Sequence, residues 1–268
     1  MPIADLDGLA LYHELHNPDG GATVALLHGL GSCGDDWPFQ LPALAPRYRV
    51  LTLDLPGHGR SSLPRPWPSV VDYARAVLGL LDRLGEPAAH LVGLSLGGAV
   101  SLQIALDCPK RVRSLTLVNS FARLRSGPTG TARGMLRLAL VCLGPMAWVG
   151  RWVAAGLFPR PDQAALRQAA AARLASNPRR AYLAALSAAA RFDVRARLGA
   201  VGCPTLIVAG DRDQTLPLAA KRELANGIGS ARLVVVRDSG HATPLDQPEA
   251  FNEVLLSFLE GVESRASV

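Results

Sequence analysis

Residues 90–100 read HLVGLSLGGAV, an apolar run that ends at a serine and then passes through two glycines. A short apolar run that stops at Gly-rich sequence is typical of a buried strand followed by a tight turn. Ser95 lies at this turn, with Gly93 before it and Gly97 and Gly98 after it. The stretch therefore fits two interpretations: a serine nucleophile on a strained strand-to-helix turn, or a polar residue in an ordinary Gly-rich loop.

On either side of this stretch, continuous apolar runs alternate with segments of helical periodicity. The apolar runs are 23–29, 49–55, 90–94, 114–119, 205–210 and 232–236, and the helical segments are 69–85, 217–227 and 247–261. Strands that are apolar on both faces indicate a parallel sheet covered by helices on both sides. Two half-buried strands precede them at 3–6 and 9–15, joined by an Asp-Gly hairpin signal. The pattern predicts an α/β fold with a mostly parallel, eight-stranded sheet.

Residues 121–197 interrupt the alternation, because they contain no convincing strand and read as several helices. We expect them to form a helical cap, or lid, inserted over the carboxyl edge of the sheet, with 1–120 and 198–268 making the core domain. Three aromatic residues of this segment are candidates for lining a substrate pocket, or for packing between the cap helices. They are Trp148, Trp152 and Phe158.

The chain has a net charge of +6, and this charge is unevenly distributed. Thirteen arginines and two aspartates give residues 121–197 a charge of +11, which leaves −5 for the remainder. The basic residues lie in one helical insertion rather than in a nucleic-acid-binding motif, so we expect no nucleic-acid partner. The cap is either a solvated helical surface or a device that attracts an anionic substrate, an acidic carrier protein or an anionic lipid surface.

Composition argues against a membrane-spanning or disulfide-stabilised protein. Hydrophobic residues make up 49% of the 268 residues, enough for a large core. The most apolar stretch, 138–150, is too short for a spanning helix, which needs about 20 residues. The N-terminal residues lack the features of a secretory signal, so we expect a cytoplasmic protein. The four cysteines form no C-x-x-C pair, and nothing implies a metal or an organic cofactor.

Two further polar residues follow predicted strands. Asp213 comes shortly after the run 205–210, and His241 shortly after the run 232–236. Ligands collect at the carboxyl ends of parallel strands, so we expect Ser95, Asp213 and His241 to lie close together. A serine hydroxyl needs a base to take its proton, and the imidazole needs a carboxylate to orient it. We predict a Ser-His-Asp triad, with Asp211 as the competing acid.

A tetrahedral intermediate also needs donors for its oxyanion. The segment HGLGS, residues 28–32, lies at the end of the first strand of the parallel block, where a backbone N–H could face the turn at Ser95. We assign the backbone N–H groups of Leu30 and Leu96 as the oxyanion hole. His28 is expected to hold this loop by hydrogen bonds rather than to take part in catalysis.

With these motifs in place, the sequence resembles the α/β-hydrolase family over essentially its whole length. The motifs are HGLG (28–31), DLPGHGRSS (54–62), GLSLGG (93–98), GDRDQTLP (210–217) and GHATPLDQPEAF (240–251). The motif G-x-S-x-G alone is a weak signal in a chain with 26 glycines, but the combination is specific. The run 114–119 ends in Asn119, so the alternative acid position used by some relatives holds no carboxylate.

The resemblance is strongest to cap-bearing serine carboxylesterases and enol-lactone hydrolases. Relatives such as dehalogenases and epoxide hydrolases use an aspartate as nucleophile, whereas this chain has Ser95. The resemblance implies a carboxylic-ester hydrolase that works through an acyl-enzyme. The alternatives are a lactonase or an acyl-carrier-protein ester hydrolase that uses the basic cap, and a non-catalytic member of the fold that binds a ligand in its pocket.

Overall fold

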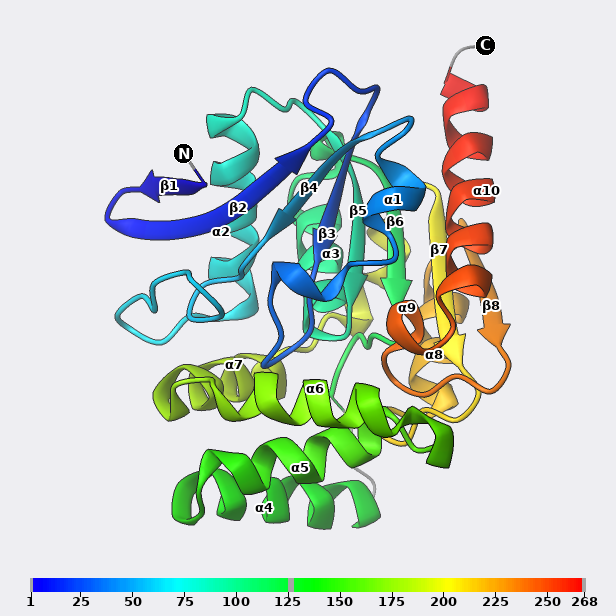
Figure 1. Ribbon diagram of the computed structural model, residues 1–268. Coiled ribbons are helices and arrows are strands. Elements are labelled where there is room, and N and C mark those ends of the chain that lie inside the picture. Colours follow the sequence, from blue (N-terminus) through cyan, green and yellow to red (C-terminus); the bar gives the residue numbers. More distant parts are fainter. Residues whose placement is uncertain (1, 125–127, 267–268) are drawn as a thin grey trace.

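A single twisted sheet of eight strands forms the centre of the computed structural model, which describes residues 2–124 and 128–266 (Figure 1). The strands are β1 (Ile3–Leu6), β2 (Leu9–His16), β3 (Thr23–Leu27), β4 (Arg49–Leu53), β5 (Ala89–Leu94), β6 (Val112–Val118), β7 (Thr205–Gly210) and β8 (Ala231–Val236). Their order is β1-β2-β4-β3-β5-β6-β7-β8. The pairs β1–β2 and β2–β4 are antiparallel and the remaining pairs are parallel. The predicted mostly parallel, eight-stranded sheet is confirmed.

Helices cover both faces of this sheet. On one face lie α2 (Val70–Arg83), α3 (Leu96–Asp107) and α8 (Leu218–Gly227), whose apolar side chains join the larger buried cluster. On the other face lie α1 (Leu41–Leu44) and α10 (Pro248–Ala266), which enclose a second cluster around Trp37, Leu44 and Phe251. Two core layers separated by one sheet are what strands apolar on both faces require. None of the described helices is both long and apolar enough to cross a membrane.

Local sequence signals explain where the α2 helix begins and ends. The side chain of Ser69 accepts a hydrogen bond from the backbone N–H of Asp72, and the Asp72 side chain accepts one from the Ser69 N–H, which makes a capping box. After the helix, Gly85 adopts a φ of +72°, a conformation that glycine tolerates best. The observed helix therefore lies within the predicted range 69–85.

The predicted strand at 232–236 differs from the others because it lies at the edge of the sheet. The corresponding strand β8 pairs only with β7, and the side chain of Val235 is 43% exposed. An apolar run in the sequence does not distinguish an edge strand from a central one. The expectation that this strand is covered on both faces is therefore wrong, although its place in the parallel sheet is correct.

Four helices lie between β6 and β7 in the chain and cross the end of the sheet toward which the arrows of β6, β7 and β8 point (Figure 1). They are α4 (Pro128–Leu143), α5 (Met146–Leu157), α6 (Ala164–Ala175) and α7 (Arg179–Arg191), and we call them the cap helices. They share a buried cluster of their own that includes Val149, Val153 and Tyr182. Residues 125–127, including one of the thirteen arginines, lie outside the described part of the chain.

Candidate active site

Ser95 occupies a strained turn between strand β5 and helix α3. Its φ is 53° and its ψ is −109°, a backbone conformation that residues with a side chain rarely adopt. The turn is fixed from both sides: the Ser95 N–H donates to the carbonyl of Val118 at 2.9 Å, and the Ser95 carbonyl accepts from Ser120 Oγ at 2.8 Å. The strain is therefore held by neighbouring structure, and it places the hydroxyl at the carboxyl edge of the sheet.

The glycines around Ser95 are required by close backbone contacts. A Cβ atom on Gly93 would overlap the main chain of Gly97, and a Cβ on Gly97 would overlap the carbonyl of Leu27. The start of α3 therefore lies directly against the ends of β3 and β5. Only residues without a side chain allow this approach.

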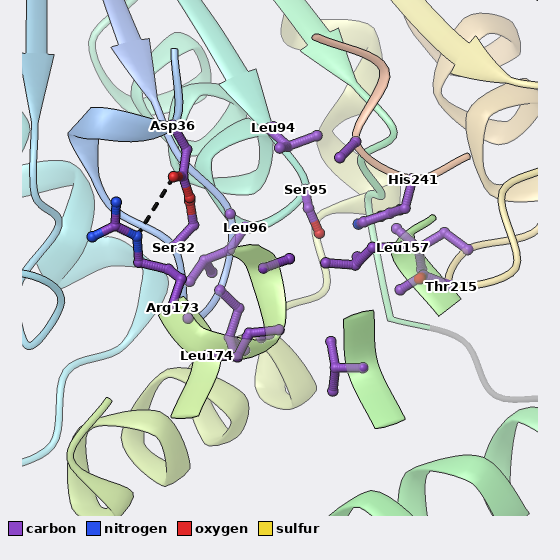
Figure 2. A pocket seen from close by; sticks show the side chains of 18 of the residues that line it. Ser32, Asp36, Leu94, Ser95, Leu96, Leu157, Arg173, Leu174, Thr215 and His241 are labelled. Atoms are coloured by element: carbon purple, nitrogen blue, oxygen red, sulfur yellow. Dashed lines mark hydrogen bonds and ion pairs between the residues drawn. The ribbon is translucent and has the colours of Figure 1, made fainter. Parts of the chain in front are cut away.

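His241 lies on the loop after β8, with its ring against Asp213. The distance from His241 Nδ1 to Asp213 Oδ2 is 2.9 Å. In Figure 2 the other edge of the ring is turned toward the hydroxyl of Ser95. The His241 backbone N–H donates to the carbonyl of Leu157, at the end of cap helix α5, at 3.1 Å. The three predicted triad residues are thus brought to one place, from loops that follow β5, β7 and β8.

Asp213 has four hydrogen-bond donors around its carboxylate. Oδ1 accepts from the backbone N–H groups of Thr215 at 2.7 Å and Leu216 at 3.0 Å, while Oδ2 accepts from His241 and from Lys221 Nζ at 2.5 Å. Burial by itself raises the pKa of Asp213, but His241 and Lys221 together hold it well below its usual range. The carboxylate is therefore ionised at any working pH.

The competing acid Asp211 has a different task. Its Oδ1 accepts a hydrogen bond from the backbone N–H of Ser239 at 3.2 Å, which links the ends of β7 and β8. The imidazole of His241 contacts Asp213 instead. The structure thus separates two carboxylates that the sequence places only two residues apart.

Lys221 is a site residue that the sequence analysis did not identify. It lies on α8, its side chain is 0% exposed, and its ammonium group contacts Asp213 Oδ2 and the carbonyl of Leu216. A signal was present in the sequence, since only two lysines occur in the chain and this one shares a helix face with the buried Leu224. A lysine on an apolar helix face is unusual unless it has a buried partner.

The two predicted oxyanion donors border the same pocket as Ser95. Leu96 is the first residue of α3, and Leu30 lies in the loop that follows β3. Neither backbone N–H donates a hydrogen bond to another group in the part of the chain that the structure describes. Free N–H groups at a helix N-terminus favour negative charge. Both groups are thus available to a ligand oxygen beside Ser95.

His28 holds the loop that carries Leu30. The Nδ1 atom of His28 lies 2.8 Å from the carbonyl of Gly29, and its Nε2 accepts from the backbone N–H of Leu55 at 2.9 Å. Because Nε2 is an acceptor, Nδ1 carries the proton and donates it to Gly29. Burial lowers the pKa of His28 to about 4, so the ring is neutral at neutral pH. These contacts give His28 a structural task, as expected.

The cap helices also hold this loop. Asn177, between α6 and α7, donates from its side-chain amide to the carbonyl of Gly31 at 2.8 Å. Gly31 has a φ of +79°, and a side chain there would collide with Leu174 and Tyr182. The loop that carries Leu30, which we call the predicted oxyanion loop, is therefore packed directly beneath α6 and α7.

The pocket in front of Ser95 has a mostly apolar wall contributed by both the core and the cap helices. It holds about 930 Å³ of free space, counted out to its open mouth. Core residues such as Leu94 and Leu216 line it together with cap residues such as Val153 and Leu157. A mostly apolar pocket with a few polar groups is suited to a small organic ligand.

Of the three cap aromatics predicted to line the pocket, the structure places only Phe158 in its wall. Trp148 is 53% exposed, so its assignment to the pocket is wrong. Trp152 packs among the cap helices under the guanidinium of Arg133, with 5.8 Å between the group and the ring, and it is also wrongly assigned to the pocket wall. Helix rotation decides which aromatic faces inward, and the sequence of a helix that is apolar on several sides does not fix it.

One end of the pocket is polar. Arg173 and Asp36 form an ion pair there, with 3.6 Å between Arg173 Nε and Asp36 Oδ1 (Figure 2). The hydroxyl of Ser32 donates a hydrogen bond to Asp36. Burial raises the pKa of the Asp36 carboxyl, although Ser32 and Arg173 oppose the rise. Arg137 also reaches the pocket, and its guanidinium donates to the hydroxyl of Tyr182 at 2.9 Å. No motif in the sequence pointed to any of these polar groups.

Many of the cap arginines are bound to acceptors within the protein. Arg167 donates to the carbonyl of Phe158 at 3.0 Å, Arg179 to that of Gly144 at 2.7 Å, and Arg197 to the carboxylate of Asp107 at 2.8 Å. Such contacts give these side chains a part in holding the segment together. They account for some of the arginine content without a partner molecule.

Neither a metal cluster nor a reactive thiol is evident beside Ser95. No group of three or more His, Cys, Asp or Glu in the described ranges is arranged to hold a metal ion. Cys33, next to the predicted oxyanion loop, is 1% exposed, and burial raises its pKa to about 12. Its thiol is therefore protonated and shielded, and Ser95 is the candidate nucleophile in this region.

Comparison with known proteins agrees with the fold and the motifs. A family model described as the alpha/beta hydrolase fold matches residues 22–248. The chain is 36% identical over 268 residues to the provisionally named carbamate hydrolase RutD of Variovorax paradoxus, covering 96% of this chain and 98% of that protein.

Solved structures give the same result. The enol-lactonase from Burkholderia xenovorans superposes with a TM-score of 0.90 and 26% identity, covering 97% of this chain and all of that one (100%). A hydrolase from Pseudomonas aeruginosa superposes with a TM-score of 0.86 and 32% identity, covering 96% and 98% of the two chains.

Proposed function

The chain belongs to the α/β-hydrolase fold family and is a hydrolase, and from this premise we propose that it cleaves carboxylic esters through an acyl-enzyme on Ser95. One observation carries the proposal. His241 Nδ1 lies 2.9 Å from Asp213 while the opposite edge of the ring is turned toward Ser95 on its strained turn (Figure 2). This is the order of contacts that activates a serine hydroxyl.

In the proposed reaction, Ser95 Oγ attacks the ester carbonyl as His241 Nε2 takes its proton. Asp213 holds the ring with Nδ1 protonated and stabilises the imidazolium. The N–H groups of Leu30 and Leu96 bind the oxygen that becomes negative. The intermediate collapses when the C–O bond to the alcohol breaks and His241 returns the proton to the leaving oxygen.

The acyl-enzyme is then hydrolysed by the same groups. His241 takes a proton from a water molecule, which attacks the acyl carbonyl, and the second intermediate is again held by Leu30 and Leu96. The bond to Ser95 Oγ breaks and the serine recovers its proton from His241. The products are a carboxylic acid and an alcohol, one water molecule is consumed for each ester, and the chain is regenerated.

We further propose that residues 121–197 act as a cap domain over a core formed by 1–120 and 198–268. Two contacts support a functional role for the cap. The carbonyl of Leu157 accepts from the backbone of His241, and Asn177 binds the carbonyl of Gly31 beside the oxyanion donors. The cap helices thus contact both the loop of the base and the loop of the oxyanion hole.

A second candidate is a lactonase or a hydrolase of another acyl compound that carries a negative charge. Arg137 and Arg173 in the pocket wall favour this candidate, because a guanidinium group binds a substrate carboxylate well. The names of the relatives point to lactones and carbamates as substrates of those proteins. An acidic carrier protein delivering an acyl group to the basic cap is the other form of this candidate.

The test is a comparison of kcat/KM across four substrate classes. These are p-nitrophenyl esters of graded acyl length, lactones with and without a carboxylate, aryl carbamates, and carrier-bound acyl groups. Turnover of neutral esters that is abolished in Ser95→Ala supports the ester hydrolase. A preference for anionic lactones that weakens steeply with added salt supports the second candidate. If the wild type and Ser95→Ala are equally inactive on every class, the serine mechanism is wrong.

A further inference from the structure

We propose that Lys221 is a positioning residue of the active site, whose ammonium group neutralises the Asp213 carboxylate and thereby extends the activity of His241 to lower pH. The inference rests on the proposed serine mechanism. It concerns a residue that neither touches the substrate nor belongs to the triad. The reason to single it out is that a fully buried cation contacts the triad acid directly.

The geometry places two donors on one oxygen atom. Asp213 Oδ2 lies 2.5 Å from Lys221 Nζ and 2.9 Å from His241 Nδ1, while Oδ1 is occupied by two backbone N–H groups. The side chains of Asp213 and Lys221 are 1% and 0% exposed. Water therefore screens neither charge, and the ammonium group acts on the same oxygen that orients the imidazole.

Asp213 is the charged group that acts most directly on the ammonium group of Lys221. Burial lowers the pKa of Lys221, and Asp213 opposes that fall. Other charged side chains on the surrounding elements have other contacts or lie toward the surface. Arg212 forms an ion pair with Asp238 at 2.8 Å, and both side chains are more than half exposed. Arg133 of α4 donates a hydrogen bond to the carbonyl of Gln214, and Asp246 accepts one from Ser239 at 2.9 Å. Arg222 of α8 is exposed.

Because Lys221 neutralises the charge of Asp213, it changes the free energy of placing a proton on His241. In a triad with an unpaired carboxylate, an imidazolium beside it forms a neutral pair. Here Asp213 and Lys221 are already a neutral pair, so a proton on His241 gives the buried group a net positive charge. A nearby like charge disfavours the protonated form of a base. Removal of the Lys221 charge should therefore make the imidazole easier to protonate, so that activity is lost at a higher pH than in the wild type.

A structural role for Lys221 alone makes a different prediction. If the residue only supports the loop after β7, its removal lowers stability and activity by the same factor at every pH. If it sets the charge of the site, its removal shifts the acid limb of kcat/KM along the pH axis. The pH profile separates the two.

The experiment is the pH dependence of kcat/KM on a neutral p-nitrophenyl ester for the wild type, Lys221→Met and Lys221→Gln. We expect the acid limb of both variants to move toward higher pH by about one unit or more. The matched control is Lys110→Met, which removes the only other lysine of the chain, an exposed residue, and leaves the limb in place. Lys221→Arg retains the charge and should keep the limb near the wild-type position.

Variants that turn over the ester with an unmoved acid limb would overturn the proposal for Lys221 and leave the proposed function intact. Absence of ester turnover in the wild type would overturn both. If the two uncharged variants do not fold, Lys221→Arg decides. An acid limb of this charge-retaining variant that moves toward higher pH as far as is expected for loss of the charge contradicts the proposal.

Discussion

The side-chain amide of Asn119 donates a 2.8 Å hydrogen bond to the main-chain oxygen of His241. The same amide donates to Thr243 Oγ1 at 2.8 Å, and the Asn119 carbonyl oxygen accepts from the backbone N–H of Gly210 at 2.9 Å. One buried side chain at the end of β6 therefore connects the end of β7 to the loop of the proposed base.

Replacing Asn119 should therefore damage both stability and activity. Asn119→Ala leaves the buried carbonyl of His241 and the N–H of Gly210 without partners, each at a cost of about 1–3 kcal/mol in the free energy of unfolding. We expect kcat to fall as well, because the His241 loop loses its anchor. Urea unfolding and steady-state kinetics measure the two effects. Thr116→Val on the same strand is the control, since the buried Thr116 hydroxyl has no hydrogen-bond partner among the described residues. Equal losses in both variants would contradict the role given to Asn119.

The turn at Ser95 should not accept a side chain on Gly93. Gly93→Ala drives a Cβ into the main chain of Gly97 and Gly98, so we expect a loss of at least about 3 kcal/mol in the free energy of unfolding, or failure to fold. The control is Gly134→Ala on α4, where nothing lies within 4 Å of the added atom. There the better helix propensity of alanine predicts a gain of up to about 1 kcal/mol. A Gly93→Ala variant as stable as the wild type would contradict the packing described here.

The sequence predicts the sheet well because its signals are local and strong. Each central strand is a continuous apolar run, and Ser95, Asp213 and His241 each follow such a run. The polar end of the pocket carries no comparable signal. Asp36 and Arg173 lie 137 positions apart in the sequence, on segments with no shared motif, and they meet only because α6 crosses the loop after β3.

The positions of the three cap aromatics could not be predicted from the sequence. Trp148, Trp152 and Phe158 look alike in the sequence, yet only Phe158 reaches the pocket wall. Whether each of these side chains faces the pocket depends on how α4 to α7 are rotated about their axes and pack against each other. Periodicity gives the existence of such helices, but their packing depends on tertiary contacts.

Buried histidines should make the folded protein sensitive to mild acid. Burial lowers the pKa of His28 to about 4, and burial together with the neighbouring His28 lowers that of His58 to about 3, from an ordinary value of 6.5. Between pH 6.5 and about 4, the unfolded chain binds more protons than the folded one. The free energy of unfolding therefore falls with falling pH, by up to about 1.4 kcal/mol per unit for each histidine.

Urea unfolding at several pH values between 7 and 5 measures this dependence. His58→Gln removes one of the two groups, so its free energy of unfolding should fall less steeply with falling pH than that of the wild type. Identical slopes for the two proteins would show that His58 binds no extra proton on unfolding. The buried neutral ring inferred for His58 would then be wrong.

Arg173 should discriminate between charged and neutral substrates. Arg173→Gln removes a cation at the polar end of the pocket, so we expect kcat/KM for a carboxylate-bearing ester to fall at least about tenfold relative to its neutral analogue. Arg151→Gln is the matched control, because it removes the same charge from an exposed position on α5. If kcat/KM for the charged substrate falls by the same factor in both variants, the cause is the summed positive charge of the cap. A contact between Arg173 and the substrate in the pocket is then contradicted.

Covalent labelling by a fluorophosphonate, followed by intact-mass and peptide mass spectrometry, tests whether Ser95 is the nucleophile. A serine activated by His241 attacks the phosphorus atom, expels fluoride and retains the phosphonyl group. The account predicts one adduct per folded chain, on the peptide that contains Ser95, and none in Ser95→Ala. A folded wild-type protein that forms no adduct, or an adduct formed equally in Ser95→Ala, would contradict the assignment of Ser95 as the nucleophile.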